Sequence, residues 1–319
     1  MHNARAVMKL FFFLLTFPLL YWPQGTETAP QLKQAGIEQI AVPPNNVDAW
    51  RKVGFKVIAL PKNELEGRDR LLVPGLQRRI NVASPTRVPW VDANGWRFLR
   101  RPGGQYLYDL TMGRAALAAA EAFVYNADAV LKIEPADLPA LGQMLAFLRS
   151  LPADELPSSA DLALIDDGSV TTGEVMNLLV RRNLPFRLET SPSSLYKLNV
   201  KIGTREYPLD EAADPSAFAQ KIRRQIGDDN RTIRIYGSEV VIARLVSDST
   251  KMRLHLLNYS GRELAGLRVR LRGKFAKGEA NVFGLGRTAL EDFVVADGAT
   301  EFTIKQMNQY AMIELSLTK

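Results

Sequence analysis

Residues 105–150, QYLYDLTMGRAALAAAEAFVYNADAVLKIEPADLPALGQMLAFLRS, decide the fold of the first part of the chain. The apolar run Gln105–Tyr108 predicts a strand, and the alanine-rich stretch Thr111–Asn126 predicts a helix. A second strand is expected at Ala129–Ile133 and a second helix at Leu138–Ser150. Continuous apolar strands are typical of a parallel sheet that is covered on both faces. This stretch therefore predicts an α/β unit.

The same alternation continues toward the amino terminus. Short apolar strands are expected at Ile37–Val42 and Phe55–Leu60, and a further strand at Arg79–Ala83. Helical segments are expected at Gln31–Ala35 and Val47–Val53. Together these elements predict an open parallel βα domain over residues 26–151.

A small βαβ unit is expected after a linker. Leu151–Ser159 is rich in proline and serine, which is a linker composition. A strand at Asp161–Ile165, a helix at Thr172–Asn183 and a strand at Phe186–Glu189 then form the βαβ pattern. A helix at Asp214–Ile226 completes this unit, which we place at residues 160–227.

The last part of the chain, residues 231–319, contains only strand patterns. Short apolar strands separated by glycine or asparagine predict an antiparallel β-sandwich. The expected strands are Thr232–Tyr236, Glu239–Val246, Met252–Tyr259, Leu267–Leu271, Ala280–Phe283, Glu301–Ile304 and Tyr310–Leu317.

Residues 1–25 have the pattern of an export signal. Arg5 and Lys9 precede the apolar run Leu10–Trp22, which is shorter than the ~20 residues of a spanning helix. No Ala-x-Ala cleavage site follows, so an uncleaved short anchor is the alternative. In either case we expect export to the periplasm or the cell exterior, with membrane contact only through this segment.

Missing residue types exclude several chemistries. The chain has no cysteine, which excludes disulfides, thiolate nucleophiles and thiolate metal sites. Its two histidines, His2 and His255, are too few for a histidine metal site, and His255 stands in a strand pattern. No glycine-rich phosphate loop stands between a strand and a helix. We therefore expect no metal and no cofactor, and any hydrolytic chemistry would use carboxylates.

One stretch, SPTRVPWVDANGWRF at residues 84–98, has the composition of a sugar site. Trp90 or Trp96 could stack on the apolar face of a pyranose ring. Arg87, Asp92 and Asn94 could form hydrogen bonds with its hydroxyl groups. The alternative is an irregular loop whose tryptophans are packing anchors.

Acidic residues at the ends of predicted strands are the candidate catalysts. A glycosidase needs two carboxyl groups with different surroundings. We predict Asp92 of the stretch at residues 84–98 and Glu134 as this pair, and Asp109 as a substrate-binding residue. Glu134 and Asp109 follow predicted parallel strands, and parallel sheets bind ligands at the carboxyl ends of their strands. For each acid the alternative is a helix cap or a turn.

Basic residues alternate along one predicted strand, so several share a face of the sheet. Stacking aromatic residues do not interleave with them, which argues against a nucleic-acid partner. We expect a solvated face, and an acidic glycan or an anionic membrane surface is the alternative. These residues are Arg262, Arg268, Arg270, Arg272, Lys274 and Lys277.

Two stretches resemble secreted multidomain glycoside hydrolases related to β-galactosidases. ALIDDG at 163–168, with LPFRL at 184–188, is similar to the strands of their flavodoxin-like accessory domain. LHLLNY at 254–259 and AMIEL at 311–315 are similar to the first and last strands of their C-terminal sandwich. The resemblance covers about half of the chain. It implies that the first domain is a TIM-like barrel, truncated here because a complete barrel takes at least about 200 residues.

These observations lead to two hypotheses. In the first, an exported glycoside-hydrolase-like protein binds or hydrolyses a carbohydrate through the carboxylates and tryptophans of its first domain. In the alternative, a non-catalytic envelope or periplasmic protein serves as a docking subunit of a larger assembly, with a protein partner or further copies of itself. Whether the chain is an enzyme stays open, since a reduced barrel could be a degenerate, inactive glycoside hydrolase.

Overall fold

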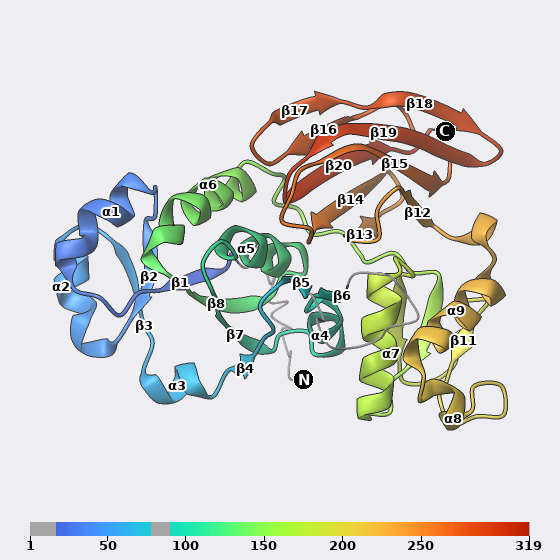
Figure 1. The fold of residues 1–319 in the computed structure, drawn as a ribbon, viewed down its shortest axis with the longest axis horizontal. Helices are drawn as coiled ribbons and strands as arrows, with labels where there is room; N and C mark the ends of the chain where they lie inside the picture. Colours follow the sequence, from blue (N-terminus) through green and yellow to red (C-terminus); the bar gives the residue numbers. More distant parts are fainter. Residues whose placement is uncertain (1–16, 78–89, 319) are drawn as a thin grey trace, which may run out of the picture.

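Six parallel strands form the central sheet of the first unit (Figure 1). The computed structural model describes residues 17–77 and 90–318. In spatial order the strands of this sheet are β3 (Lys56–Ala59), β2 (Gln39–Val42), β1 (Leu19–Tyr21), β8 (Asp128–Lys132), β7 (Gln105–Asp109) and β4 (Asp69–Arg70). Each strand is parallel to the strands with which it pairs.

This strand order is that of a β/α barrel that is open at one place. Within this sheet, strands that are consecutive in the sequence lie next to each other, except β3 and β4. The last strand, β8, pairs with the first, β1. Among the described strands, β3 and β4 are not paired with each other, and the barrel opens between them. A TIM barrel closes with eight strands. The expected truncated, TIM-like parallel domain is therefore confirmed.

Helices connect these strands and cover the sheet. The alanine-rich helix α5 is buried along its whole length, because it lies between the sheet, helix α6 and the β-sandwich. Helix α6 also packs closely on the end of α1: a Cβ added to Gly142 would lie 1.7 Å from the carbonyl oxygen of Ala35. The helices are α1 (Ala29–Gln34), α2 (Val47–Lys52), α3 (Lys62–Glu66), α4 (Gly95–Arg100), α5 (Ala115–Val124) and α6 (Leu138–Arg149).

Apolar side chains cover both faces of the sheet. On the face toward α5 and α6, Leu20 and Tyr108 belong to the main core. The opposite face would line the inside of a closed barrel, and it carries a smaller cluster of Ala41, Leu107 and Val130. The inside of the open barrel is therefore filled by side chains, as it is in complete barrels.

Strand β1 corrects the boundary expected at residue 25. Leu20 and Trp22 are each 1 % exposed, and β1 lies between β2 and β8. The first unit thus begins before residue 26, because a short apolar run can form a buried parallel strand as well as the apolar part of a signal. Residues 1–16, with Arg5 and Lys9, lie outside the described residues, as does the strand expected at Arg79–Ala83. Within the described ranges, no helix is both long and apolar enough to cross a bilayer.

The second unit is a three-stranded parallel sheet with three helices. Strand β9 (Leu162–Ile165) lies between β10 (Phe186–Glu189) and β11 (Asn199–Val200). Helix α7 (Val170–Arg181) connects β9 and β10, as expected, and its N-terminus is capped by the Ser169 side chain, which accepts from the backbone N–H of Thr172. The remaining helices are α8 (Leu209–Ala212) and α9 (Pro215–Ile226).

The segment expected to be a linker is bound to the sandwich. Ser158 forms an antiparallel bridge with Val246, and the backbone N–H of Ser159 donates to the carbonyl of Leu245 at 3.0 Å. Arg253 donates to the carboxylate of Asp154 at 2.7 Å. We call residues 154–159 the strap, because they run as an extended segment along the sheet.

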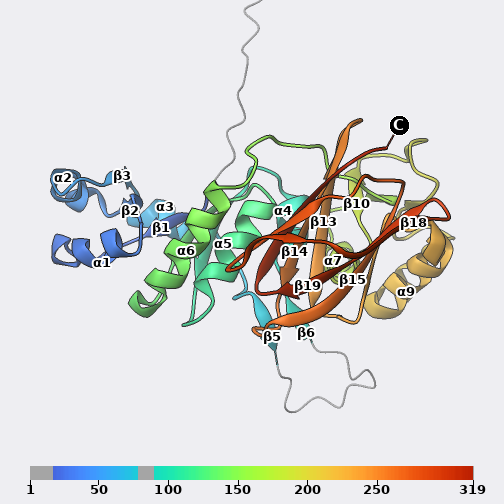
Figure 2. The same cartoon turned by 90° about the horizontal axis from the view of Figure 1, so that it is seen from above.

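The third unit is the expected antiparallel β-sandwich. Its inner sheet packs on the first unit through Ile242, Leu257 and Met312, whereas Leu254 and Phe302 belong to the core between the two sheets. Figure 2 shows α1 and α2 at the end of the molecule away from the sandwich. The inner sheet contains β13 (Val241–Ser247), β14 (Lys251–Asn258), β20 (Tyr310–Ser316), β16 (Glu279–Val282) and β17 (Gly286–Ala289). The outer sheet contains β12 (Ile233–Tyr236), β15 (Leu264–Arg272), β19 (Ala299–Met307) and β18 (Glu291–Ala296).

Candidate functional site

The predicted site residues follow the carboxyl ends of the strands of the six-stranded sheet. After β4 the chain forms a hairpin of β5 (Gly75–Gln77) and β6 (Trp90–Asp92), and then helix α4. Asp109 ends β7, and Glu134 follows β8. Arg87 lies outside the described residues. The described part of the stretch expected to be an irregular loop, from Trp90 onward, therefore forms a strand and the start of a helix, and it follows the edge where parallel β/α folds bind ligands.

Both tryptophans of this stretch pack against helix α7 of the second unit. The guanidinium of Arg181 lies 3.8 Å from the centre of the Trp90 ring, and the Trp90 indole N–H donates to Asp92 at 3.0 Å. Trp96 is 8 % exposed, and a Cβ added to Gly173 of α7 would lie 3.1 Å from its ring. The two rings thus join the first and second units, which is the packing role given as the alternative to sugar stacking.

Asn94 is fully buried and its amide is used inside the protein. Its oxygen accepts from the backbone N–H of Leu72 at 3.0 Å, and its nitrogen donates to the carbonyl of the same residue at 2.9 Å. The nitrogen also donates to the carboxylate of Glu121 at 3.0 Å. These bonds attach the start of α4 to the connection after β4, and they engage the groups that would bind a sugar hydroxyl.

Glu121 is a buried acid that the sequence interpretation missed. It lies within the alanine-rich helix α5 and is 0 % exposed. Besides the two N–H groups of Asn94, it accepts from the hydroxyls of Tyr108 at 2.5 Å and of Tyr259 at 2.6 Å. Burial raises its pKa above the usual range, and these hydrogen bonds oppose the shift. An acid inside an otherwise apolar helix was the available signal, because such a group must find partners when buried.

The predicted catalytic acids have different surroundings. Asp92 is 6 % exposed and lies opposite Gly75 in the hairpin. A Cβ on Gly75 would lie 2.6 Å from a guanidinium nitrogen of Arg114, so this cation is on the side to which the Asp92 side chain points. Glu134 is exposed, and Asp109 forms an ion pair of 3.1 Å with Lys132. Asp92 is thus buried, whereas Glu134, its predicted partner, is exposed.

A second contact between the first two units involves an acid of the DDGS turn. Arg100 of α4 donates to the two carboxylate oxygens of Asp166 at 2.9 and 2.8 Å, and to the carbonyl of Ser169 at 2.8 Å. Such bidentate pairs fix geometry strongly. Together with the two tryptophans, this pair attaches α4 and the β5–β6 hairpin to α7.

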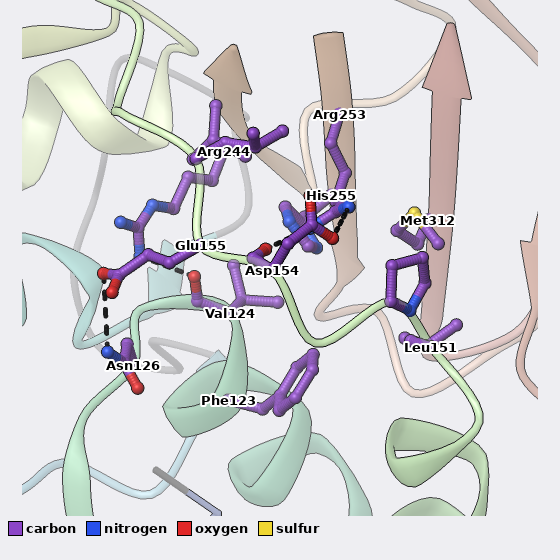
Figure 3. A pocket seen from close by; sticks show the side chains of 13 residues that line it. Phe123, Val124, Asn126, Leu151, Asp154, Glu155, Arg244, Arg253, His255 and Met312 are labelled. Atoms are coloured by element: carbon purple, nitrogen blue, oxygen red, sulfur yellow. Dashed lines mark hydrogen bonds and ion pairs between the residues drawn. The ribbon is translucent and has the colours of Figure 1, made fainter. Parts of the chain in front are cut away.

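A small cavity lies where α5, the strap and the inner sheet of the sandwich meet (Figure 3). Its volume is about 40 Å³, which is room for a few water molecules at ~10–15 Å³ each. Pockets for organic ligands measure about 300–1,000 Å³. The cavity is therefore too small for a sugar ring.

The side chains of this cavity support the junction between the units. Arg244 donates to the carbonyl of Val124 at the end of α5 and to the hydroxyl of Ser158 in the strap. The ring nitrogen Nδ1 of His255 lies 2.7 Å from the hydroxyl oxygen of Tyr310. Burial, with Arg244 and Arg253 nearby, lowers the pKa of His255 to about 3, so the imidazole is neutral near pH 7. Within residues 17–77 and 90–318, no group of three or more metal-ligating side chains comes together.

Comparisons with known proteins find similarity in structure only. No family model matches the sequence, and no curated protein matches it. Among solved structures, α-L-fucosidase isoenzyme 2 from Paenibacillus thiaminolyticus aligns with 68 % of this chain and 61 % of its own, at a TM-score of 0.51 and 10 % identity. The fold is glycoside-hydrolase-like.

Two β-galactosidases show weaker structural similarity. The GH42 enzyme from G. stearothermophilus has a TM-score of 0.39 and 8 % identity, with 77 % of this chain and 53 % of its own covered. The enzyme from Rahnella sp. R3 has a TM-score of 0.38 and 10 % identity, with 90 % and 61 % covered. The chain thus spans less than two thirds of each of these enzymes. A glycoside-hydrolase-like fold does not by itself define an activity.

Proposed function

We propose that this protein binds a carbohydrate and does not hydrolyse it. The glycoside-hydrolase-like fold supports the carbohydrate part of the proposal. One observation carries the absence of hydrolysis: of the predicted acids, Asp92 is buried, whereas Glu134 and Asp109 are exposed. Trp90 and Trp96 pack on helix α7, so the proposed binding does not rely on them as a stacking platform.

The acids at the same edge support this view. A glycosidase combines an acid whose surroundings keep it protonated with a second carboxylate at a fixed distance of about 5–9.5 Å. Glu134 is exposed, and Asp109 is paired with Lys132. Asp92 is buried, and the indole N–H of Trp90 donates to it. Among the predicted acids, the structure therefore offers Asp92 without a comparably buried second carboxyl.

Hydrolysis is tested with the full chain and a panel of chromogenic aryl glycosides that includes β-galactosides and α-fucosides. We expect release no faster than in buffer, for wild type and for Asp92→Asn and Glu134→Gln alike. Turnover by wild type that is lost in both variants, but kept in Asp109→Asn, would show an enzyme and overturn the proposal.

Binding is tested on a broad glycan array with the same protein. We expect retention of at least one class of glycan by protein that unfolds cooperatively on heating. Trp96→Ala should mainly lower the thermal midpoint, because Trp96 packs on α7, whereas a sugar-stacking residue would change binding at constant stability. A folded protein that binds no glycan contradicts the carbohydrate part.

Export belongs to the proposal, and the basic residues before the apolar run Leu10–Trp22 support it. Any cleavage is expected upstream of Leu19, because a cut at residue 25 would remove the central strand β1. Mass spectrometry of the protein from periplasmic and medium fractions tests this. Recovery of the intact chain from the cytoplasm alone would argue against export.

A docking role is the second candidate, and one observation favours it. Strand β3 pairs only with β2 among the described strands, and Ile58 on it is 43 % exposed. Such an edge can accept a strand from a protein partner. The substitution Ile58→Pro should abolish binding of that protein partner without affecting glycan binding. Unchanged binding of the partner would show that strand β3 is not its binding site.

A further inference from the structure

The outer face of the sandwich carries a cluster of arginines. In the outer sheet, Arg234 of β12 lies directly opposite Arg270 of β15. Arg268 and Arg272 lie two residues to either side of Arg270, so all four side chains point to the same face. We call these four residues the basic face. It belongs to the sheet that does not pack on the first unit (Figure 1).

Few carboxylates balance this charge. Glu301 of β19 lies opposite Arg270 and serves two arginines, with ion-pair distances of 2.5 Å to Arg268 and 3.6 Å to Arg270. Arg234 lies 3.5 Å from Asp229 and 3.9 Å from Asp228, and Asp228 is already bound to Arg223 at 3.0 Å. Among the described residues, Arg272 has no ion pair within 4 Å, although its charge acts on the carboxyl group of Asp161. The face therefore has a surplus of positive charge.

This arrangement is unfavourable for the sheet alone. Like charges directly opposite one another in an antiparallel pair are destabilising. In addition, Nη1 of Arg270 is buried and has no hydrogen-bond acceptor in the described protein, which costs stability. Proteins place like charges opposite one another, or leave a buried polar atom unpaired, mainly where function requires it. What the face lacks, within the described part of the chain, is an anionic acceptor for Arg272 and for the buried Nη1 of Arg270.

We propose that the basic face binds an acidic polysaccharide through its carboxylate or sulfate groups. Guanidinium groups bind such planar or tetrahedral anions with two parallel hydrogen bonds. Positions two residues apart on a strand are about 6.6–6.8 Å apart, and neighbouring strands are about 4.8 Å apart. The face therefore presents a row of cations that suits a repeated anion better than a single one. This inference rests on the proposed carbohydrate function and names the class of carbohydrate.

A nucleic acid fits this face less well. Nucleic-acid surfaces of this type stack bases on exposed aromatic rings. Tyr236 is an aromatic residue on the same face, opposite Arg268, but the Arg234 guanidinium lies 5.1 Å from its ring centre. The ring is thus partly covered by a residue of the basic face. Recognition of anionic groups, rather than stacking, is what the side chains support.

The test compares three polymers with one backbone: dextran, carboxymethyl-dextran and dextran sulfate. In affinity gel electrophoresis we expect the full chain to be retarded by one or both charged polymers and not by dextran, with weaker retardation at higher salt. The double variant Arg268→Gln/Arg272→Gln should bind at least about tenfold more weakly, since hydrogen bonds to charged groups are strong. Both side chains are exposed, so the thermal midpoint should stay near that of wild type.

Two further variants sharpen the result. Glu301→Gln removes the carboxylate that competes for Arg268 and Arg270, and it should strengthen binding. Arg51→Gln/Lys62→Gln carries the same charge change on the first unit, where the two side chains are 60 % and 85 % exposed, and it should bind like wild type. If this control lost as much binding to the charged dextrans as the basic-face variant, the net charge of the protein would explain the effect. That result would overturn the proposal.

Other outcomes separate this inference from the proposed function. Equal retardation by the three dextrans, or none, while the glycan array shows binding of a neutral glycan, overturns the basic face and keeps the proposed function. Failure to bind any glycan overturns both. Binding to single-stranded DNA or to anionic phospholipid vesicles that matches or exceeds binding to the charged dextrans would identify a nucleic acid or a membrane as the ligand, and would also overturn the proposal.

Discussion

Glu121 of helix α5 accepts a hydrogen bond of 2.6 Å from the hydroxyl of Tyr259, which follows strand β14 of the sandwich. The same carboxylate binds Tyr108 of β7 and Asn94 at the start of α4. One buried acid therefore connects the sheet of the first unit, the connection that carries the predicted site and the third unit. The four donors are neutral, so the carboxylate is satisfied by hydrogen bonds without an ion pair.

Tyr259→Phe should lower the free energy of unfolding by about 1.5–3 kcal/mol, the range for hydrogen bonds to charged groups. The phenyl ring keeps the packing, so the loss reports the hydrogen bond. Urea unfolding measures it. In the double variant with Glu121→Gln the two effects should be strongly non-additive, because the residues share one network. Additive effects would show that the bond contributes little.

Burial also makes stability depend on the protonation of Glu121. Its pKa is raised in the folded state, so the folded protein holds this proton more tightly than the unfolded chain. The contribution of Glu121 is therefore greatest below about pH 4.5 and is lost as the pH rises through the raised pKa. Glu121→Gln should remove this decrease. Unfolding free energies from pH 4 to 8 for the two proteins test the sign.

His255 has the opposite effect. Burial, together with Arg244 and Arg253, lowers its pKa to about 3 in the folded protein, against ~6.5 when unfolded. The neutral imidazole therefore contributes fully to the free energy of unfolding above about pH 6.5. This contribution is lost as the pH falls toward 3, and the loss is about 3–5 kcal/mol at most. Between pH 7 and pH 4, the free energy of unfolding should fall less in His255→Gln than in wild type. An identical pH profile for the two proteins would contradict this.

Gly142→Ala should destabilise the protein although alanine favours helices. In an exposed helix interior this change adds about 1 kcal/mol of stability. Here the new Cβ would lie 1.7 Å from the carbonyl oxygen of Ala35, so α1 and α6 must move apart. We expect a loss of about 1–3 kcal/mol, as in other overpacked cores. Thermal unfolding decides the sign, and a raised midpoint would show that the two helices separate easily.

Truncation tests the place of strand β1. A chain that starts at residue 26 lacks the strand between β2 and β8, and it should be insoluble or lack a cooperative unfolding transition. A chain that starts at Phe17 keeps β1 and should unfold cooperatively. Circular dichroism during heating compares the two. A stable fold without residues 17–25 would show that the first unit folds without β1, the strand between β2 and β8.

Strands and helices with a long pattern could be predicted from the sequence. β7, β8 and β9 have four or five residues and contain apolar runs of three or four, and the seven predicted sandwich strands match strands of the structure. Strands β4, β5 and β11 have two or three residues, which is too short for any periodicity to show. Strand β1 was assigned to an export segment, since both patterns are short apolar runs. The pairing of Leu19–Tyr21 with β2 and β8 identifies this part of the run as a strand.

The candidate site could be located from the sequence, but its role could not. Asp109 and Glu134 were expected at the carboxyl ends of parallel strands, and they follow β7 and β8, whereas Asp92, expected in a loop, ends the antiparallel strand β6. Whether a tryptophan stacks on a sugar or on a neighbouring helix depends on what faces it. For Trp90 this is Arg181, which is distant in sequence and has no recognisable pattern that relates it to the tryptophan. The importance of Glu121 depends likewise on Tyr259, in another unit.

The position of β1 also has a consequence for synthesis of the chain. Leu19 leaves the ribosome well before Val130, its partner in β8. Until that residue emerges, β1 can pair only with β2, so the growing chain carries an apolar strand with one open edge. Closing such a distant pairing is slow, because the entropy of a long loop must be lost first. The nascent first unit is therefore expected to depend on a chaperone, or on slow translation, until β8 is complete.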